Sequence, residues 1–331
     1  MTVLRAGLVG LGMMGRHHAR VLRSLEGVEL VAVADPNGDP YGAAAGLEVL
    51  PDVDKLIATG IDICVLATPT ALHEELGLKL ATAGVHTLVE KPLASSVAGA
   101  QRLADAFEAA GLVGCVGHVE RYNPALLNLR QRLERNELGE IYQVITRRQG
   151  PFPNRVSDVG VVKDLATHDI DLTAWVTQQS YASVSARTAH KSGRAHEDLV
   201  AVVGQLTDGT VVSHLVNWLS PMKERVTVVT GGRGAFVADT VAADLTFHAN
   251  GVQRLEWETM ASFRGVTEGD VIRYAIPKPE PLRVELAAFR DAVLGKDADI
   301  VGMREGEKVV AVAEAILQSA TTGRTVDLPV E

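Results

Sequence analysis

The chain has 331 residues, a net charge of −9 and 47% hydrophobic but only 4% aromatic residues. That length suffices for two domains of roughly 100–200 residues, and the acidic balance excludes non-specific nucleic-acid binding, which needs a basic surface. No apolar run approaches the roughly 20 residues of a membrane span and no leader signature is recognisable, so we expect a cytoplasmic protein with no membrane partner. Both cysteines, Cys64 and Cys115, lie in apolar runs, which predicts buried thiols rather than a disulfide.

The first 118 residues alternate apolar strand patterns with helical patterns. Strands are predicted at 4–10, 28–34, 61–67, 86–89 and 112–116, and helices at 13–25, 72–83 and 97–110. Strands that alternate with helices of this length indicate βαβ units and a parallel sheet.

After residue 118 the pattern changes, because strands now follow one another. Helices are predicted at 124–136, 162–177, 282–294 and 304–321, and strands at 141–148, 199–206, 210–218, 225–230 and 234–238. Thr207-Asp208-Gly209 joins two of these strands as a hairpin turn. We therefore predict an α/β protein with a doubly wound domain over residues 1–118, and a second domain over 119–331 whose sheet is mainly antiparallel with flanking helices.

A glycine-rich run, Gly10-Leu11-Gly12-Met13-Met14-Gly15, follows the first strand and opens the first helix, and Asp35 ends the second strand. A GxGxxG run in this context is typical of a dinucleotide site, since its glycines allow a tight turn, a close approach of the pyrophosphate and close helix packing. The helix N-terminus adds N–H groups for the phosphates. Asp35 would accept hydrogen bonds from ribose hydroxyls and repel a 2′-phosphate, so we predict NAD rather than NADP. The competing interpretation is a plain glycine-rich turn.

Two further motifs lie where parallel strands end, which is where open α/β sheets bind ligands. Thr68 and Pro69 follow the third strand with His73 opening the next helix, and Glu90-Lys91-Pro92 ends the fourth strand. A crowded lysine can serve in proton transfer, and a bond before proline can be cis. Taken alone, Lys91 would be read as a solvated surface lysine; the neighbouring motifs favour a functional one.

The predicted helix 162–177 carries Asp164, His168 and Asp171 at positions i, i+4 and i+7, which share one helix face. Such a polar stripe either faces solvent or lines a cleft. Three residues of these types could also bind zinc.

Together these motifs resemble the Gfo/Idh/MocA family of sugar and inositol oxidoreductases, over essentially the whole chain. The resemblance rests on the glycine run, Ala67-Thr68-Pro69 with His73, Glu90-Lys91-Pro92, Gly117-His118 with Arg121 and Pro124, Asp164 with His168, and Glu305-Gly306. It implies a Rossmann domain followed by a substrate-binding and oligomerisation domain with an open, largely antiparallel sheet, in a homodimer or homotetramer. It also implies a metal-free hydride transfer in which Lys91, Asp164 and His168 are catalytic, in the cleft between the domains.

The site residues expected on these grounds fall into two groups. The cofactor group is Gly10, Gly12, Met13, Met14, Gly15, Asp35, Thr68, Pro69, His73, Glu90 and Lys91. The substrate group is Arg121, Tyr122, Asn123, Arg148, Arg155, Asp164, His168 and Asp171. His168 suits a general base by its ordinary pKa, Asp164 would orient it, and Lys91 would stabilise the developing alkoxide. Whether Lys91 or His168 carries the proton stays open.

Arg147, Arg148 and Arg155 flank a proline-containing loop before this helix. They are either solvated arginines or a clamp for a phosphate or carboxylate. The loop resembles a subgroup of the family that oxidises UDP-N-acetylglucosamine-type nucleotide sugars at C3. The alternatives are a free inositol or sugar as substrate, or a dinucleotide-sensing regulator without turnover, against which the retained Lys91, Asp164 and His168 argue.

Overall fold

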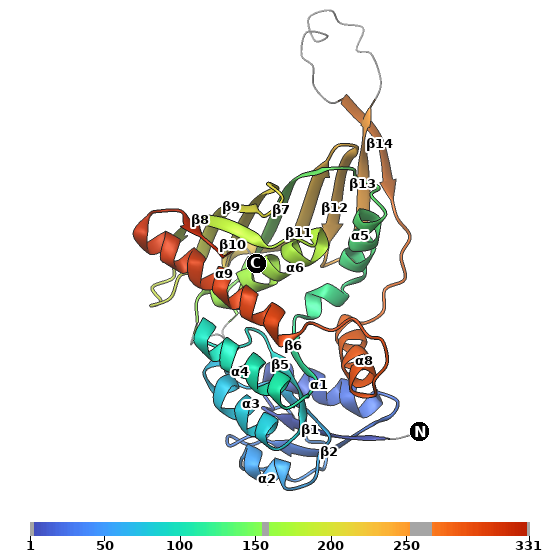
Figure 1. Ribbon diagram of the computed structural model, residues 1–331, viewed down its shortest axis with the longest axis vertical. Helices are drawn as coiled ribbons and strands as arrows, with labels where there is room; N and C mark the ends of the chain where they lie inside the picture. The colour runs from blue at the N-terminus through green and yellow to red at the C-terminus, as the bar shows by residue number, and fades with distance from the viewer. Residues whose placement is uncertain (1–2, 154–158, 252–266, 330–331) are drawn as a thin grey trace, which may run out of the picture. The chain divides into compact units, whose positions relative to one another are not determined.

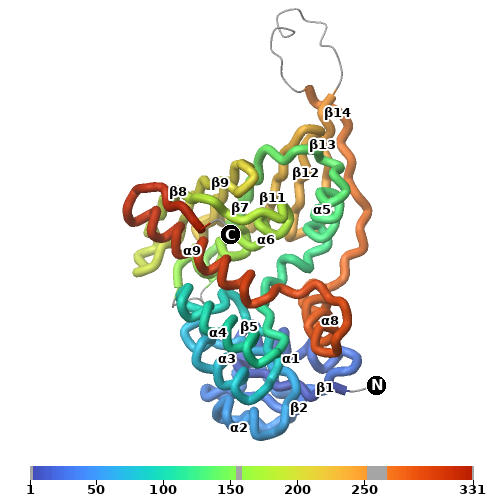
Figure 2. The backbone as a smooth tube through the Cα atoms, in the orientation of Figure 1, coloured from blue at the N-terminus to red at the C-terminus, as the bar shows by residue number. Residues whose placement is uncertain are grey.

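The computed structural model describes residues 3–153, 159–251 and 267–329. These residues form two compact units, which Figures 1 and 2 trace from blue to red along the chain. Unit 1 is built mainly from Met1–Tyr122 and Pro279–Glu314, and unit 2 from Asn123–Pro153, Asp158–Lys278 and Ala315–Glu331. Each unit is described by itself.

Unit 1 is a parallel six-stranded sheet with helices on both faces. Its strands are β1 (Leu4–Val9), β2 (Val28–Ala34), β3 (Val49–Leu50), β4 (Ile63–Leu66), β5 (His86–Glu90) and β6 (Gly114–Gly117). Its helices are α1 (Met13–Ser24), α2 (Val53–Ile57), α3 (His73–Thr82), α4 (Val97–Ala109), α8 (Pro281–Val293), the first part of α9 (Met303–Thr322) and the short 3₁₀ turns η1 (Thr70–Leu72) and η2 (Val119–Tyr122). The strand order is β3-β2-β1-β4-β5-β6, with every pair parallel. In this doubly wound order the strand sequence reverses beside β1, and ligands bind at the carboxyl ends of the strands there.

The sheet of unit 1 is buried on both faces, which explains why its strands are continuous apolar runs. On β4, Ile63 and Val65 contribute to one core cluster while Cys64 and Leu66 contribute to the other, as the alternation of side chains along a strand requires.

Helix α8 belongs to unit 1 although it follows unit 2 in the chain. Leu282, Leu286 and Phe289 lie at helical spacing and share a core cluster with Leu4 and Leu22. The division expected at residue 118 assigns this helix to the second domain. Helical periodicity identifies such a helix but does not say which sheet its apolar stripe covers, so the chain returns to unit 1 without a local signal.

Unit 2 is a nine-stranded sheet with helices on one face. Its strands are β7 (Ile141–Pro151), β8 (Tyr181–Ala189), β9 (Leu199–Leu206), β10 (Val211–Asn217), β11 (Leu219–Gly231), β12 (Gly234–Asp239), β13 (Asp244–Gly251), β14 (Thr267–Arg273) and β15 (Val326–Asp327). Its helices are α5 (Pro124–Glu134), a π-helical turn η3 (Val162–Ala166), α6 (Thr167–Thr177) and the end of α9. The order is β14-β13-β12-β11-β7-β10-β9-β8-β15. Among the described strands of this sheet only β7 and β10 pair in parallel.

Burial alternates along the central strands of unit 2. On β7, Val144, Thr146 and Arg148 are buried, and Arg148 bonds to Asp169 of α6. Figure 1 shows α5 and α6 lying along one face of this sheet. The predicted class, an α/β protein with a parallel and a mainly antiparallel sheet, is confirmed. Within the described part of the chain, no helix combines the length and apolar character needed to cross a bilayer.

Candidate active site

The glycine run forms a backbone turn that no side chain could occupy at two of its three glycines. Gly10 has φ +93°, and a Cβ on it would lie 2.4 Å from the carbonyl oxygen of Ala67. A Cβ on Gly15 would lie 1.9 Å from the carbonyl oxygen of Gly10. At Gly12, by contrast, a Cβ would meet no described atom within 4 Å. Gly10 and Gly15 are therefore required by the protein's own packing, whereas the space beside Gly12 is open, as the close approach of a pyrophosphate requires.

The first helix presents its N-terminus to that space. Gly12 is the N-cap of α1 and no side chain caps the helix, so the N–H groups of Met13 and Met14 in the first turn are oriented for an anion.

Asp35 links the end of β2 to the glycine turn. Its two carboxylate oxygens accept hydrogen bonds from the backbone N–H groups of Leu11 and Asn37, both at 2.8 Å. A carboxylate offers about four acceptor positions, so two backbone bonds leave capacity for ribose hydroxyls. The sequence predicted the ribose role, but the fixing of the glycine turn is visible only in the structure.

His73 ties together the ends of β4 and β5. Its Nδ1 lies 2.9 Å from the carbonyl oxygen of Pro92 and its Nε2 lies 2.9 Å from that of Thr68. Burial lowers the pKa of His73, so the neutral ring carries one N–H and donates to one of these oxygens at a time. The ring of His73 therefore bridges two loops. Its expected contact with the cofactor stays a prediction.

Thr68 is better placed for a ligand. Its hydroxyl oxygen is buried and has no hydrogen-bond partner among the described residues. A buried hydroxyl without a partner is costly, so Thr68 stays a candidate for the expected cofactor contact.

The Glu90-Lys91-Pro92 motif ends β5, with a cis bond between Lys91 and Pro92. Glu90 is buried; its Oε1 lies 2.7 Å from Nε2 of His18, and its Oε2 accepts the Lys91 backbone N–H at 3.2 Å. Burial acts to raise the pKa of Glu90, but the His18 hydrogen bond and the charges of His18 and Lys91 outweigh it and lower the pKa. Glu90 is thus an internal anion held in place beneath Lys91, and His18 is a partner that the sequence analysis missed.

In unit 2 the helix that carries the polar stripe does not begin as a regular α-helix. The N–H of Thr167 bonds back to the carbonyl of Val162, five residues earlier, which makes a π-helical turn. Asp164 lies in this turn and His168 in the first turn of α6. Asp164 therefore does not lie on a regular α-helix, as the sequence predicted, and such π turns occur frequently at functional sites.

Glu197 fixes the start of that helix. Its Oε1 accepts the N–H of Val162 at 3.0 Å and its carbonyl oxygen accepts the N–H of Val161 at 2.9 Å. A Cβ on Gly160 would lie 2.0 Å from the Glu197 carboxylate. The glutamate therefore caps the helix through a long-range contact that local sequence does not show.

Arg148 has a buried counterion within unit 2. Its Nε donates to Oδ2 of Asp169 at 2.9 Å, and both side chains are 3% exposed. The guanidinium thus binds a carboxylate of α6. Its expected contact with a substrate anion stays a prediction. Arg155 lies outside the described residues.

Three neighbouring substrate candidates also contact the protein itself. Arg121 donates to Glu305 at 2.7 Å and the Tyr122 hydroxyl donates to the carbonyl of Asp299 at 3.0 Å, both within unit 1. Asn123 caps α5 and also donates to the carbonyl of Thr240 at 3.0 Å.

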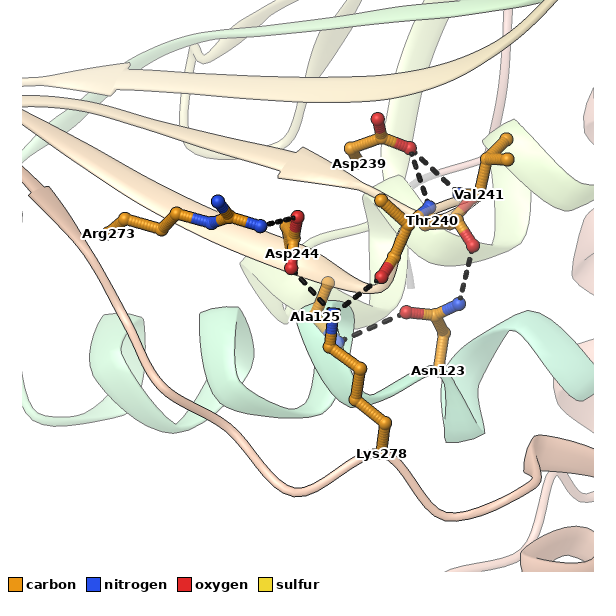
Figure 3. A network of polar contacts seen from close by, with 9 residues as sticks. Asn123, Ala125, Asp239, Thr240, Val241, Asp244, Arg273 and Lys278 are labelled. Atoms are coloured by element: carbon orange, nitrogen blue, oxygen red, sulfur yellow. Dashed lines mark hydrogen bonds and ion pairs between the residues drawn. The ribbon is translucent and has the colours of Figure 1, made fainter.

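Figure 3 shows Asn123 as part of a network in unit 2 that joins the start of α5 to the turn after β12. In the same network Lys278 and Arg273 both donate to Asp244. Asn123 therefore holds an element in place.

No group of three His, Cys, Asp or Glu side chains in the described ranges could hold a metal ion.

A parallel sheet in this order, with a glycine turn shaped for a pyrophosphate and a carboxylate ending β2, defines a dinucleotide-binding domain of the Rossmann class. Residues 4–118 match the model of an oxidoreductase family with an NAD-binding Rossmann fold, and residues 126–237 match the GFO/IDH/MocA C-terminal domain. The chain belongs to the Gfo/Idh/MocA family of oxidoreductases, and its cofactor is NAD.

The relatives of this chain are named as dehydrogenases of different substrates. It is 36% identical to inositol 2-dehydrogenase 4 of Saccharopolyspora erythraea over 58% of this chain and 59% of that protein. It is 31% identical to UDP-N-acetylglucosamine 3-dehydrogenase of Acidithiobacillus ferrooxidans over 64% of this chain and 66% of that one. These alignments thus span less than two thirds of the relatives' length.

Solved structures match along nearly the whole length. The A. ferrooxidans enzyme superposes with a TM-score of 0.84 at 25% identity, covering 97% of this chain and 99% of that one. The WlbA dehydrogenase of Bordetella pertussis, in complex with NADH and UDP-GlcNAcA, gives a TM-score of 0.81 at 25% identity and covers both chains completely, at 100% each.

Proposed function

We propose that the protein is an NAD-dependent dehydrogenase that oxidises a secondary alcohol of a sugar to a ketone. One observation carries the proposal: Lys91 leaves β5 at the same edge of the sheet as the glycine turn after β1 and the buried Thr68 hydroxyl after β4. A cation at that edge lies beside the cofactor-binding turn, which suits the stabilisation of a developing alkoxide.

Bound NAD supplies the hydride acceptor. Lys91 would hold the substrate oxygen through its Nζ, and the imidazole of His168 would take the hydroxyl proton as the carbon–hydrogen bond transfers its electron pair. Asp164 would orient His168 or anchor a second hydroxyl, with Asp171 as a further polar contact.

For the substrate we propose a UDP-N-acetylglucosamine-type nucleotide sugar, oxidised at C3. A relative and a similar solved structure are both named UDP-N-acetylglucosamine 3-dehydrogenase, and another similar structure holds UDP-GlcNAcA. The second candidate is inositol, because the relative with 36% identity is named an inositol 2-dehydrogenase.

The test is NADH formation, followed by absorbance at about 340 nm, with UDP-N-acetylglucosamine, myo-inositol and glucose in parallel. We expect Lys91→Ala and His168→Ala to lower kcat by on the order of 10²–10⁴-fold, as loss of an acid–base group does, while NAD still raises the melting temperature. Lys55→Ala, at a lysine on α2 in the same unit, is the matched control and should keep full activity. Turnover with inositol alone would favour inositol as the substrate. No turnover with any of these substrates would favour the alternative of a dinucleotide-sensing regulator without turnover.

We also propose that unit 2 associates with a second copy of the chain through the sheet face away from α5 and α6, the open face. Val203, Val211 and Leu215 point to this face and are 57%, 42% and 39% exposed. Register places Leu215 opposite Ala201 and Val203 opposite Ser213, so the apolar side chains form one patch, and such patches mark interfaces. Sedimentation at micromolar concentration should give a dimer or tetramer, and Leu215→Glu should shift it toward monomer. A wild-type monomer would contradict this proposal.

A further inference from the structure

The most completely buried ionisable pair beside the proposed catalytic lysine is formed by His18 and Glu90. His18 has no exposed surface and Glu90 is 6% exposed. Their side chains meet at 2.7 Å, between Nε2 and Oε1. His18 lies on α1, the helix whose N-terminus faces the cofactor space, whereas Glu90 immediately precedes Lys91.

The Glu90 carboxylate is confined on several sides. Oε1 meets His18, and Oε2 accepts the backbone N–H of Lys91. On β6, a Cβ at Gly117 would lie 3.2 Å from the carboxyl carbon of Glu90. The carboxylate therefore fills a space that β6 leaves open by having glycine there.

A buried carboxylate is costly unless its oxygens are satisfied. An apolar residue at position 90 would fill the strand end without that cost, so the pair needs a reason beyond packing. What the pair does in this structure is connect the cofactor helix to the backbone of Lys91 through two consecutive hydrogen bonds.

We propose that His18 is a positioning residue for Lys91 that acts through Glu90. The His18 N–H fixes the Glu90 carboxylate, and the carboxylate in turn fixes the backbone N–H from which the Lys91 side chain extends. The inference rests on the proposed catalytic role of Lys91. It adds that the helix whose N-terminus faces the cofactor space also sets the geometry of the lysine.

The charged and titratable groups around Glu90 include His18 from α1, Lys91 from its own strand end and His73 from α3. The side chain of His18 bonds directly to the carboxylate. The test therefore changes His18 and leaves Glu90 and Lys91 in place.

Three variants separate positioning from packing. His18→Leu removes the donor, His18→Gln keeps an amide donor close to the Nε2 position, and His17→Leu on the same helix is the control. We expect His18→Leu to lower kcat by on the order of 10–100-fold, the size of effect that a small misplacement of a catalytic group produces, with KM for NAD within about threefold. His18→Gln should recover most of kcat, and His17→Leu should keep it. If His18→Leu fails to fold, His18→Asn, whose amide stops short of the Nε2 position, replaces it.

A second measurement needs no substrate. Reductive methylation with formaldehyde and cyanoborohydride, read by mass spectrometry, gives the labelling rate of Lys91 with Lys55 as internal standard. We expect the Lys91:Lys55 ratio to change at least threefold in His18→Leu and to stay at the wild-type value in His18→Gln. An unchanged ratio together with unchanged kcat would overturn the inference, as would equal losses in the Leu and Gln variants.

The two failures are distinguishable. If no substrate gives NADH but the Lys91 labelling ratio responds to His18→Leu, the proposed function fails and the positioning of Lys91 stands. If turnover depends on Lys91 but neither kcat nor the ratio responds to His18, the positioning fails and the function stands.

Discussion

The buried pair of Arg148 and Asp169 gives a prediction that separates a structural arginine from a substrate-binding one. Arg148→Met removes the guanidinium but keeps most of the side-chain volume. Asp169, 3% exposed in this pair, then keeps its buried charge without the guanidinium that neutralises it. Losing one partner of a buried ion pair costs about 3–5 kcal/mol.

The matched control is the neighbouring arginine. Arg147 pairs with Glu224 at 2.7 Å, but the two side chains are 53% and 23% exposed. Exposed pairs contribute about 0–1 kcal/mol, so Arg147→Met should be nearly neutral. For a unit of this size each kcal/mol corresponds to about 2–4 °C, so Arg148→Met should lower the melting temperature by on the order of 10 °C and Arg147→Met by a few degrees at most.

Differential scanning calorimetry measures both variants and the double variant Arg148→Met/Asp169→Leu. The double variant should recover much of the loss, because replacing a buried pair with apolar side chains is often close to neutral. A different result would refute the reasoning: Arg148→Met melting within about 2 °C of wild type, with KM for an anionic sugar raised tenfold, would make Arg148 an anion clamp as the sequence first suggested.

Three further predictions follow from local geometry. Gly12→Ala should melt like the wild type without cofactor but lose the rise in melting temperature on adding NAD. Gly15→Ala should be unstable even without NAD because its Cβ, unlike a Cβ at Gly12, would overlap a backbone carbonyl. His214 is fully buried, and burial lowers its pKa from 6.5 to about 4. Between those pH values unfolding takes up a proton, so the free energy of unfolding should be highest above pH 6.5 and fall by about 3 kcal/mol as the pH drops to 4. Urea titrations of His214→Gln should show a shallower pH dependence. Cys64 and Cys115 are buried, which raises the pKa of both thiols. A disulfide reagent such as dithionitrobenzoate should therefore label neither thiol until the protein is unfolded. Labelling of the folded protein as fast as that of an exposed thiol would contradict their burial.

The fold was largely predictable because most of its strands and helices have a recognisable local sequence pattern. Apolar β-branched runs such as Val28–Ala34 coincide with a strand to the residue, and the glycine turn marks its own conformation. The elements that sequence did not single out lack such runs. Helix α2 has five residues, and β8 (Tyr181–Ala189) is rich in small and polar side chains. Helix α2 packs against α3 and β2, and β8 pairs with β9 and β15, so tertiary contacts support both elements.

Motif, spacing and family resemblance select Lys91 and His168 as candidate site residues, and their catalytic roles stay predictions. The contacts that hold these residues in place could not be predicted from the sequence. That Glu90 bonds to His18, 72 residues earlier, and that Glu197 caps the helix of Asp164, 35 residues after Val162, depends on tertiary contacts. The π turn at Val162–Ala166 was missed for a related reason, since it depends on how the helix start is held and not on a residue pattern.

The motif residues divide according to what their polar groups already contact. Hydrogen bonds to the protein's own backbone are made by the side chains of Asp35, His73 and Asn123. These side chains therefore hold the loops that carry the site. Gly12 has open space where a Cβ would be, and the buried hydroxyl of Thr68 has no hydrogen-bond partner among the described residues. A motif therefore selects residues of both kinds, and only the contacts separate them. Substituting a residue of the first kind should lower stability before it lowers affinity, whereas Gly12 and Thr68 should lose NAD affinity at unchanged stability.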